Sequence, residues 1–273
     1  AQLIDTNNGF HVWSDTYEKS DQDLFALQDE IAASISNELS SRIEGVVAEA
    51  PAKTDTSNPE ALQAYLKGRE AWRKRTAESL QIAEGMFLRA VELDPEFARA
   101  WSGLADTYLL QTDYGGRSDE EAIRLAEPAA VRAVVLGPKL GEAWASLGLL
   151  RMTAGQYKAA QSSLEQAMDL DPRYEMAPMW LANVYGSIGR MDKKRDVLLK
   201  AVELNPLEPV INVNLADLLA NSGDLEGAFE QLQRVLAITP DDASLLRALS
   251  GIEITRGNYV ASFNAARHAL RTD

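Results

Sequence analysis

Apolar residues recur along most of this chain at intervals of three and four, the spacing that places side chains on one face of a helix. In several segments a small residue comes first, a large one four positions later, and a small or branched one three positions after that. Examples are Ala83-Phe87-Ala90, Ala160-Leu164-Ala167 and Ala228-Leu232-Val235. Small residues let neighbouring helices approach closely. The pattern predicts an all-α fold of paired amphipathic helices.

Proline and glycine repeat with a fixed period of 34 residues. The prolines are Pro138, Pro172, Pro206 and Pro240, and the glycines in step with them are Gly155, Gly189, Gly223 and Gly257. A constant period of this length indicates a stacked supersecondary unit. We expect each proline to end a second helix and start the next unit. We expect each glycine to lie between the two helices of a unit, where positive φ costs it little.

Within this period the chain carries the motifs Trp101-x2-Leu104-Ala105-x2-Tyr108, Trp144-x2-Leu147-Gly148 and Leu181-Ala182-x2-Tyr185. In these residues it resembles the tetratricopeptide repeat (TPR) family. The resemblance implies a right-handed α-α superhelix of about six TPR helix pairs over residues 58–273. The expected units are 58–95, 96–138, 139–172, 173–206, 207–240 and 241–273.

Three units depart from the ideal pattern. The first has about three extra residues near Arg73–Ser79, and the second has nine, centred on a turn-rich loop at 111–117. We expect Ser118 and Glu121 to form a capping box after that loop, and Pro128 to kink the helix that follows. In the sixth unit serine and alanine replace several motif residues. The last helix is therefore either its own cap, or an open end that packs against something else.

The first 57 residues do not follow the period. Residues 1–19 are expected to be a strand pair joined by an Asn-Gly turn, and 50–57 a linker. Between them, residues 20–49 are expected to form an amphipathic connecting helix, whose apolar face is Leu24, Leu27, Ile31, Ile35 and Leu39.

This N-terminal segment contains the motifs AQLID, GFHVWSDTYE, DLFALQDEIA and LSSRI. In these motifs it resembles the junction between an α/β domain and TPRs in bacterial adenylate/guanylate cyclases and in winged-helix transcriptional regulators. The resemblance implies that the strand pair is the remnant of an upstream domain in a longer signalling protein, which could be a nucleotide cyclase. None of the cyclase or winged-helix residues is present in this chain.

Charge and composition narrow the possible functions. A net charge of −14 disfavours nucleic acid and anionic membrane as partners of this region. Cysteine is absent, His11 and His268 are far apart, and no nucleophile, base and orienting group stand in a recognisable arrangement. We therefore expect no metal, no cofactor, no catalytic site and no membrane span in these residues. The cytoplasm is favoured as the compartment, and the periplasm is the alternative if the parent protein has an upstream membrane helix.

The TPR resemblance implies that the first helix of each unit lines a concave surface that binds a protein or peptide. Counting from each proline gives a rather apolar candidate groove. Its residues are Arg99, Asp106, Leu109, Leu149, Met152, Met176, Met179, Asn183, Val213, Asp217 and Asn221. The occupant is either a partner segment, the chain's own helix at Leu24–Ile43, or a second copy. The leading hypothesis is thus a regulatory protein-interaction region, and the alternative is a homodimerisation scaffold that pairs upstream output domains.

The same pattern bears on the tryptophans and on one known mode of peptide binding. Trp101 and Trp144 share one repeat position and are expected to pack in the core, whereas Trp180 is displaced by Pro178 and is a candidate surface aromatic. Some TPRs hold a peptide C-terminus with lysine, asparagine and arginine. Only the two asparagine positions of that set are kept here, which argues against this mode.

Overall fold

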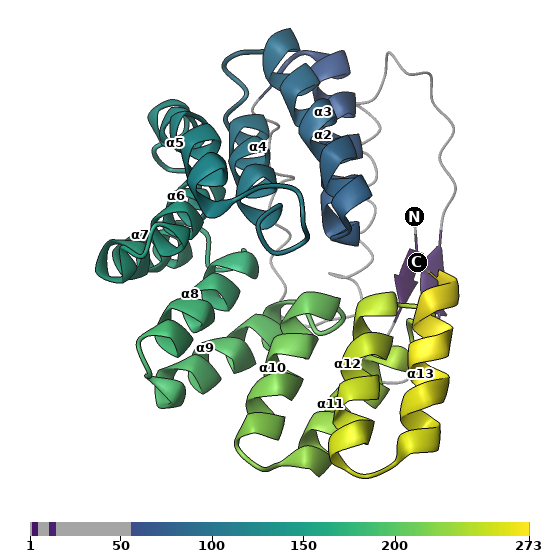
Figure 1. The fold of residues 1–273 in the computed structure, drawn as a ribbon. Coiled ribbons are helices and arrows are strands. Elements are labelled where there is room, and N and C mark those ends of the chain that lie inside the picture. The colour runs from purple at the N-terminus through teal and green to yellow at the C-terminus, as the bar shows by residue number, and fades with distance from the viewer. Residues whose placement is uncertain (1, 5–10, 15–55, 273) are drawn as a thin grey trace. The chain divides into compact units, whose positions relative to one another are not determined.

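The computed structural model describes residues 2–4, 11–14 and 56–272 (Figure 1). Strands β1 (Gln2–Ile4) and β2 (His11–Ser14) pair antiparallel, with Leu3 opposite Trp13. The predicted turn between them, the connecting helix at 20–49 and nearly all of the linker lie outside the described residues. From residue 56 onward the described chain is helical with short turns, which confirms the all-α prediction.

The first compact unit ends at Gly137, and its described residues contain two helix pairs. They are α2 (Pro59–Lys74) with α3 (Ala77–Leu93), and α4 (Ala98–Leu110) with α5 (Asp119–Leu136). Each helix packs on the next, and α4 also contacts α2. Phe87 of α3 is fully buried at the centre of this core, where its ring lies 5.8 Å from the ring of Tyr65.

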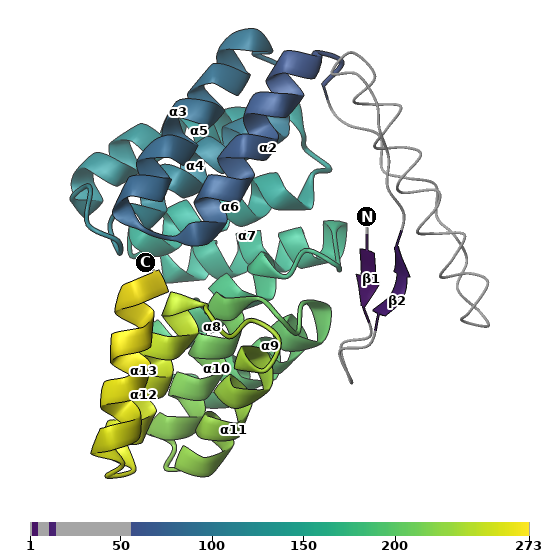
Figure 2. The ribbon, with the colours of Figure 1, turned by 90° about the vertical axis from the view of Figure 1, so that its right-hand side faces the viewer.

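The second compact unit covers residues 138–273 and contains four helix pairs. They are α6 (Gly141–Thr153) with α7 (Tyr157–Leu170), α8 (Met176–Ser187) with α9 (Met191–Leu204), α10 (Pro209–Asn221) with α11 (Leu225–Leu236), and α12 (Ala243–Thr255) with α13 (Tyr259–Thr272). The first helices also touch one another, α6 with α8 and α10 with α12. Figure 2 shows these helices from the side.

The glycines and prolines of the 34-residue period lie at the predicted turns between helices. Gly155, Gly189, Gly223 and Gly257 have φ of 70°, 75°, 91° and 81°, and each lies between the two helices of its pair. The periodic prolines follow the second helices, as expected. Trp101 and Trp144 are half-buried rather than fully in the core, and each indole Nε1 donates to a proline carbonyl, of Pro95 and Pro138, at 3.0 Å.

The two long units use their extra residues differently. In the first, α2 is lengthened and runs to Lys74, and the residue that caps it, Arg75, has a left-handed φ of 50°. In the second, the extra residues form the loop between α4 and α5. Ser118 accepts from the backbone N–H of Glu121 at 3.3 Å, but the Glu121 carboxylate binds Arg117 instead of completing the box. Helix α5 runs on through Pro128.

Trp180 corrects one prediction. It is only 1% exposed, so it is not a surface aromatic. The indole lies in the core of the second unit, edge-on to the ring of Tyr174 at 6.4 Å and 75°. Pro178, at the usual tryptophan position, is also buried, so the bulky ring enters the core two residues later.

The sixth helix pair replaces a usual glycine contact with a polar one. Ser250 of α12 and Ser262 of α13 are both buried, and their hydroxyl oxygens lie 2.9 Å apart. On its other side α13 exposes large apolar side chains: Tyr259, Val260, Phe263 and Leu270, which are 65–80% exposed. Among the described residues, therefore, no further helix covers this side of α13.

Candidate functional site

Five of the eleven predicted groove residues have almost no exposed surface. Their side chains are 0–4% exposed, and they are Asp106, Leu109, Leu149, Met176 and Met179. Arg99, Met152, Asn183 and Val213 are half-buried, while Asp217 and Asn221 are exposed. The structure thus separates the predicted set into core residues and residues with surface to offer a partner.

In the first unit, helix α4 is mostly core. Almost every side chain from Ser102 to Leu110 is buried, because α4 packs against α2, α3 and α5. Asp106 and Leu109 point into this packing, with 0% and 2% of their surface exposed. Only Arg99, near the start of α4, keeps part of its side chain accessible.

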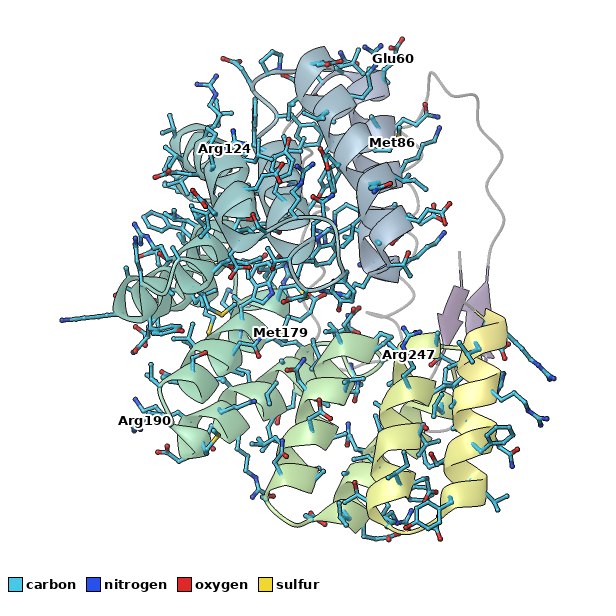
Figure 3. The ribbon with its side chains drawn as sticks, in the orientation of Figure 1. Glu60, Met86, Arg124, Met179, Arg190 and Arg247 are labelled. Atoms are coloured by element: carbon cyan, nitrogen blue, oxygen red, sulfur yellow. The ribbon has the colours of Figure 1, made fainter. Side chains whose placement is uncertain are left out.

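In the second unit the accessible predicted residues other than Met152 of α6 lie on the first helices of two successive pairs, α8 and α10. Asn183 lies on α8, and Val213, Asp217 and Asn221 lie on α10 at intervals of four, which puts them on one face. Asn183 Nδ2 lies 3.8 Å from the sulfur of the buried Met179. We call Asn183, Val213, Asp217 and Asn221 the α8–α10 patch. Figure 3 shows the side chains, with Met179 and Arg247 labelled.

A lysine from the second helix of the pair also belongs to this surface. The side chain of Lys194, on α9, lies over Gly186 of α8: a Cβ at Gly186 would be 3.3 Å from Lys194 Cδ and 3.4 Å from Nζ. Partial desolvation raises the pKa of Asp217, and the positive charge of Lys194 opposes that shift. The α8–α10 patch together with Lys194 therefore carries one acidic and one basic group beside two amides and an apolar side chain.

Sequence reasoning missed Lys194, and also Arg247 and Ile254 on α12. The Lys194 side chain lies over an inward position of α8 that holds glycine, and Gly186 is the signal that could have indicated it. Arg247 and Ile254 are exposed on α12 at the same offsets from Pro240 that gave the other predicted residues. Extending the count to the sixth unit would have found both.

The described residues contain no group of three His, Cys, Asp or Glu side chains placed to hold a metal ion. His268, one of the two histidines, has its Nε2 2.8 Å from Asp241 Oδ1. None of the helices in the described part is both long and apolar enough to cross a membrane.

Comparison with known proteins bears on the fold and the context. The family model described as tetratricopeptide repeat matches residues 65–134, 145–209 and 195–243. A thermophilic TPR protein of Thermus thermophilus superposes with a TM-score of 0.56 at 22% identity, over 75% of this chain and 99% of that one. The pilF protein of Pseudomonas aeruginosa gives 0.51 at 18% identity, over 79% and 93%. These two structures share the fold.

Two curated proteins are similar over shorter stretches. A protein of Rhizobium meliloti (strain 1021) named "Putative adenylate cyclase 3" is 32% identical over 105 residues, which are 38% of this chain and 18% of that protein. The BBSome complex member BBS4 of Mus musculus is 31% identical over 90 residues, 33% of this chain and 17% of that protein. Each match thus covers less than a fifth of the relative's length.

Proposed function

This chain belongs to the tetratricopeptide repeat family, whose fold is a scaffold for protein–protein interaction, and from that premise we propose that its second unit binds a segment of a partner protein on the α8–α10 patch. The partner segment is extended or helical. It carries an apolar side chain for Val213 and a basic side chain for Asp217. Asn183 and Asn221 form hydrogen bonds with its backbone or with its polar side chains.

The observation that carries this proposal is the composition of the exposed first-helix surface. Val213 offers half-buried apolar area, Asp217 lies one turn further along α10, and Lys194 carries the opposite charge near Asp217. Asn183 and Asn221 supply both hydrogen-bond donors and acceptors. A small apolar contact surrounded by orienting polar groups is how peptide segments are recognised in grooves of helices.

The proposed partner belongs to a bacterial signalling system. The similarity to a protein named as an adenylate cyclase supports this context. The N-terminal motifs, which resemble the junction between an output domain and TPRs, support it too. In this role the chain is the regulatory, interacting region, and the chemistry belongs to a domain upstream of it.

Peptide selection tests the proposal directly. Random peptides of about 15 residues, long enough to span a groove of this kind, are displayed on phage and selected on the full chain. The enriched sequences are synthesised and measured by fluorescence anisotropy. We expect enriched peptides with an apolar residue beside a lysine or arginine. Val213→Glu and Asp217→Lys should each weaken binding at least about 10-fold, the effect of losing roughly 1.4 kcal/mol.

A charge change outside the patch is the matched control. Glu230→Lys, at an exposed position on α11, alters the net charge by the same amount as Asp217→Lys and should leave binding unchanged. Selected peptides that bind both patch variants as well as the original chain would refute the assignment.

The alternative function, a homodimerisation scaffold, is favoured by one observation. Phe263 and Leu270 on α13 are 65% and 80% exposed, and with Tyr259 and Val260 they form an apolar surface. Exposed apolar surfaces of this kind mark interaction sites. If α13 pairs two copies, sedimentation velocity at tens of micromolar will show a dimer that Phe263→Lys abolishes. Leu199→Lys, an exposed apolar position on α9, should leave it intact. A monomer at every concentration would exclude this function.

A further inference from the structure

Helix α13 has apolar side chains on two faces, and among the described residues only one of these faces is packed. Ala265 and Ala269 are buried in the hydrophobic cluster of the last helix pairs. The other face has apolar residues at intervals of four, three and four, the spacing of a seam between two paired helices. We call these residues, Tyr259, Phe263, Ala266 and Leu270, the α13 seam. Its large side chains are 65–80% exposed.

The equivalent residues of the preceding second helix are covered. One period of 34 residues before each member of the seam, α11 has Leu225, Phe229, Leu232 and Leu236. Leu232 and Leu236 lie in one hydrophobic cluster with leucines of α12, and Phe229 packs against the same cluster. The surface that α11 gives to the first helix of the next pair is therefore open on α13, as far as the described chain extends. The occupant that fits it is a helix.

The charges of α13 favour a second copy in one direction. The helix contains Arg267 and Arg271 but no aspartate or glutamate, and neither arginine forms an ion pair within the described residues. Two copies of a chain with a net charge of −14 repel one another, and a contact surface without carboxylates reduces that repulsion locally. Because both arginines lie in the second half of α13, a parallel pair would bring them together. An antiparallel pair would keep them at opposite ends.

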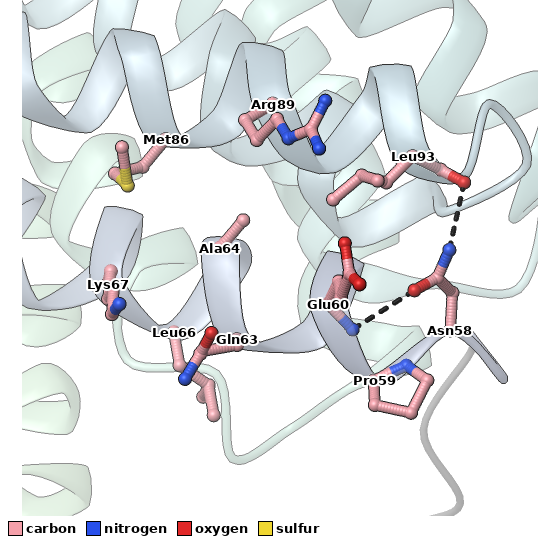
Figure 4. A pocket seen from close by; sticks show the side chains of 10 residues that line it. All are labelled: Asn58, Pro59, Glu60, Gln63, Ala64, Leu66, Lys67, Met86, Arg89 and Leu93. Atoms are coloured by element: carbon pink, nitrogen blue, oxygen red, sulfur yellow. Dashed lines mark hydrogen bonds between the residues drawn. The ribbon is translucent and has the colours of Figure 1, made fainter. Parts of the chain in front are cut away.

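Exposed apolar surface on the first helix pair has a different character. A hollow of about 710 Å³ lies between α2 and α3, where Leu66 is 47% exposed (Figure 4). Charges of both signs line it, from Glu60, Lys67 and Arg89, and Arg89 Nη1 lies 3.7 Å from Glu92 Oε2. That surface selects neither sign of charge in a partner. Leu66 is therefore a suitable control position, an exposed apolar side chain away from α13.

Antiparallel pairing makes the α13 seam complementary to itself. With a two-fold axis at the middle of the seam, Tyr259 would face Leu270 of the second copy. Phe263 would face Ala266 of the second copy. Each ring would thus meet a smaller side chain, and large and small residues would alternate as close packing of helices requires. Ala266 stands where α11 has Leu232, so the residue that departs from the repeat pattern is the one that leaves room for the ring.

We propose that two copies of this chain pair through the α13 seam, antiparallel and about a two-fold axis at its middle. The proposal rests on the homodimerisation scaffold put forward above as the alternative function, and it adds which residues meet. Helix α13 of the second copy takes the place on α13 that α12 takes on α11. A contact between two helices of 14 residues buries less than the about 1,600 Å² of a standard interface, so we expect micromolar self-association. The seam shares no residue with the α8–α10 patch, so peptide binding there is a separate property.

Disulfide formation reports the direction of the two helices, and the absence of cysteine means that only introduced thiols react. A Tyr259→Cys chain and a Leu270→Cys chain, one of them enlarged by a tag, are mixed and mildly oxidised. The disulfide between the two different chains should exceed each like-with-like product at least about 10-fold, since only positions 259 and 270 come within the roughly 7 Å between Cα atoms that a disulfide needs. In the control, Asn264→Cys replaces Tyr259→Cys. Position 264 is exposed but lies on another side of α13, so it should give no excess.

Exchanging the two central residues of the seam tests the fit without changing the composition. Phe263→Ala alone leaves a void and Ala266→Phe alone sets ring against ring, so each should weaken dimerisation in sedimentation velocity at least about 10-fold. Phe263→Ala/Ala266→Phe again places a ring opposite a methyl group, and it should return to within about 3-fold of the original chain. Leu66→Ala, in the hollow of the first helix pair, is the control and should change nothing. Circular dichroism checks that each variant keeps its helices.

The outcomes separate this pairing from the function on which it rests. A monomer at every concentration would overturn both. A dimer that forms like-with-like disulfides would overturn the antiparallel pairing and leave homodimerisation standing, and so would an exchanged variant that dimerises no better than the single variants. Unchanged dimerisation in Phe263→Ala would overturn the α13 seam as the contact.

Discussion

At the scale of single residues, one repeat position does the same task with two chemistries. The sixth residue after a periodic proline donates a hydrogen bond to that proline's carbonyl, at 3.0 Å in each of three units. The donor is an indole in Trp101 and Trp144, and a carboxamide in Asn212. Each bond satisfies a carbonyl in the turn between units, where the backbone has left its helix. A search for tryptophan at this repeat position would not have identified Asn212 as the equivalent donor.

Asn212 makes two hydrogen bonds besides the one to the proline carbonyl. It is fully buried, donates also to the Glu208 carbonyl at 2.8 Å, and accepts from Gln231 Nε2 at 2.6 Å. We expect Asn212→Leu to lower the free energy of unfolding by about 1–3 kcal/mol, because the Gln231 amide is left buried without its partner. Urea denaturation measures this. Asn212→Leu/Gln231→Leu should recover part of the loss, and a double variant no better than the single one would contradict the network.

Asp217 makes stability depend on pH. Its pKa is raised in the folded chain by desolvation, so the folded state holds the proton more tightly than the unfolded state does. That contribution is fully present below the ordinary value of 3.8 and is lost as the pH rises through the raised value. Asp217→Asn should therefore fall less in stability than the original chain as the pH is raised from about 3.5 to 7. Parallel stability curves would show that Asp217 plays no part.

At the scale of helices, close approach is set by glycines that face large side chains. A Cβ at Gly103 of α4 would lie 2.5 Å from Phe87 Cε1, and one at Gly68 of α2 would lie 2.8 Å from the same atom. The Phe87 ring therefore fills a space between three helices. That space is open because residues 68 and 103 have no Cβ. The sequence motif indicated small residues at such positions, but not which ring each one meets.

The two kinds of helical glycine should respond in opposite directions. Gly103→Ala should destabilise the chain by about 1–3 kcal/mol, because the buried Phe87 ring must move. Gly85→Ala, on α3, has open space around the new methyl group and should stabilise by about 0.5–1 kcal/mol. Thermal unfolding of both variants checks the pair. If both changes have the same sign, packing against Phe87 is not what fixes glycine at 103.

The loop between α4 and α5 is held by one arginine. Arg117 Nη2 donates to both carboxylate oxygens of Glu84 at 2.8 Å, Nε donates to Gln111 Oε1 at 2.5 Å, and Nη1 to Glu121 at 2.9 Å. Burial opposes the charge, but the hydrogen bond and the negative charge of Glu84 raise the Arg117 pKa. The extra residues of this unit are thus tied to the helices around them.

Removing that arginine should free the loop before it affects the core. Arg117→Ala is expected to cost about 1.5–3 kcal/mol, the range for hydrogen bonds to charged groups, and to speed amide exchange over residues 111–117 at least about 10-fold. Arg117→Lys should recover only part, because lysine lacks the planar fork. Unchanged exchange in the alanine variant would mean that the loop is ordered by its own turns.

At the scale of the whole molecule, negative charge opposes folding. The net charge of −14 gives the folded chain a net electrostatic self-repulsion. We expect the melting temperature to rise when salt is increased from about 10 to about 150 mM, because screening shortens the range of this repulsion to about 8 Å. Differential scanning calorimetry measures the shift. A fall in melting temperature would mean that specific ion pairs such as Arg117–Glu84 outweigh the overall repulsion.

The period told us where the helices, turns and positive-φ glycines lie, because spacing alone fixes those. It did not tell us how deep a side chain lies. Met176 and Met179 satisfy the counting rule for the binding face and are nevertheless core, since α8 is packed on α6 as well as on α9. Trp180 was misplaced for the same reason. Depth depends on which neighbour fills the space, and that is a property of contacts rather than of period.

The fixed 34-residue interval has a consequence for how such a chain changes length. Gly155 and Gly189 occupy the same point of successive cycles, with the same sign of φ and open space around each. Removing or duplicating the stretch between them would rejoin the backbone in an equivalent conformation. Each helix would still meet a neighbour of its own type. Evolution by unequal exchange can therefore lengthen or shorten this protein by whole units, whereas slips of one or two residues would put every later side chain on the wrong face.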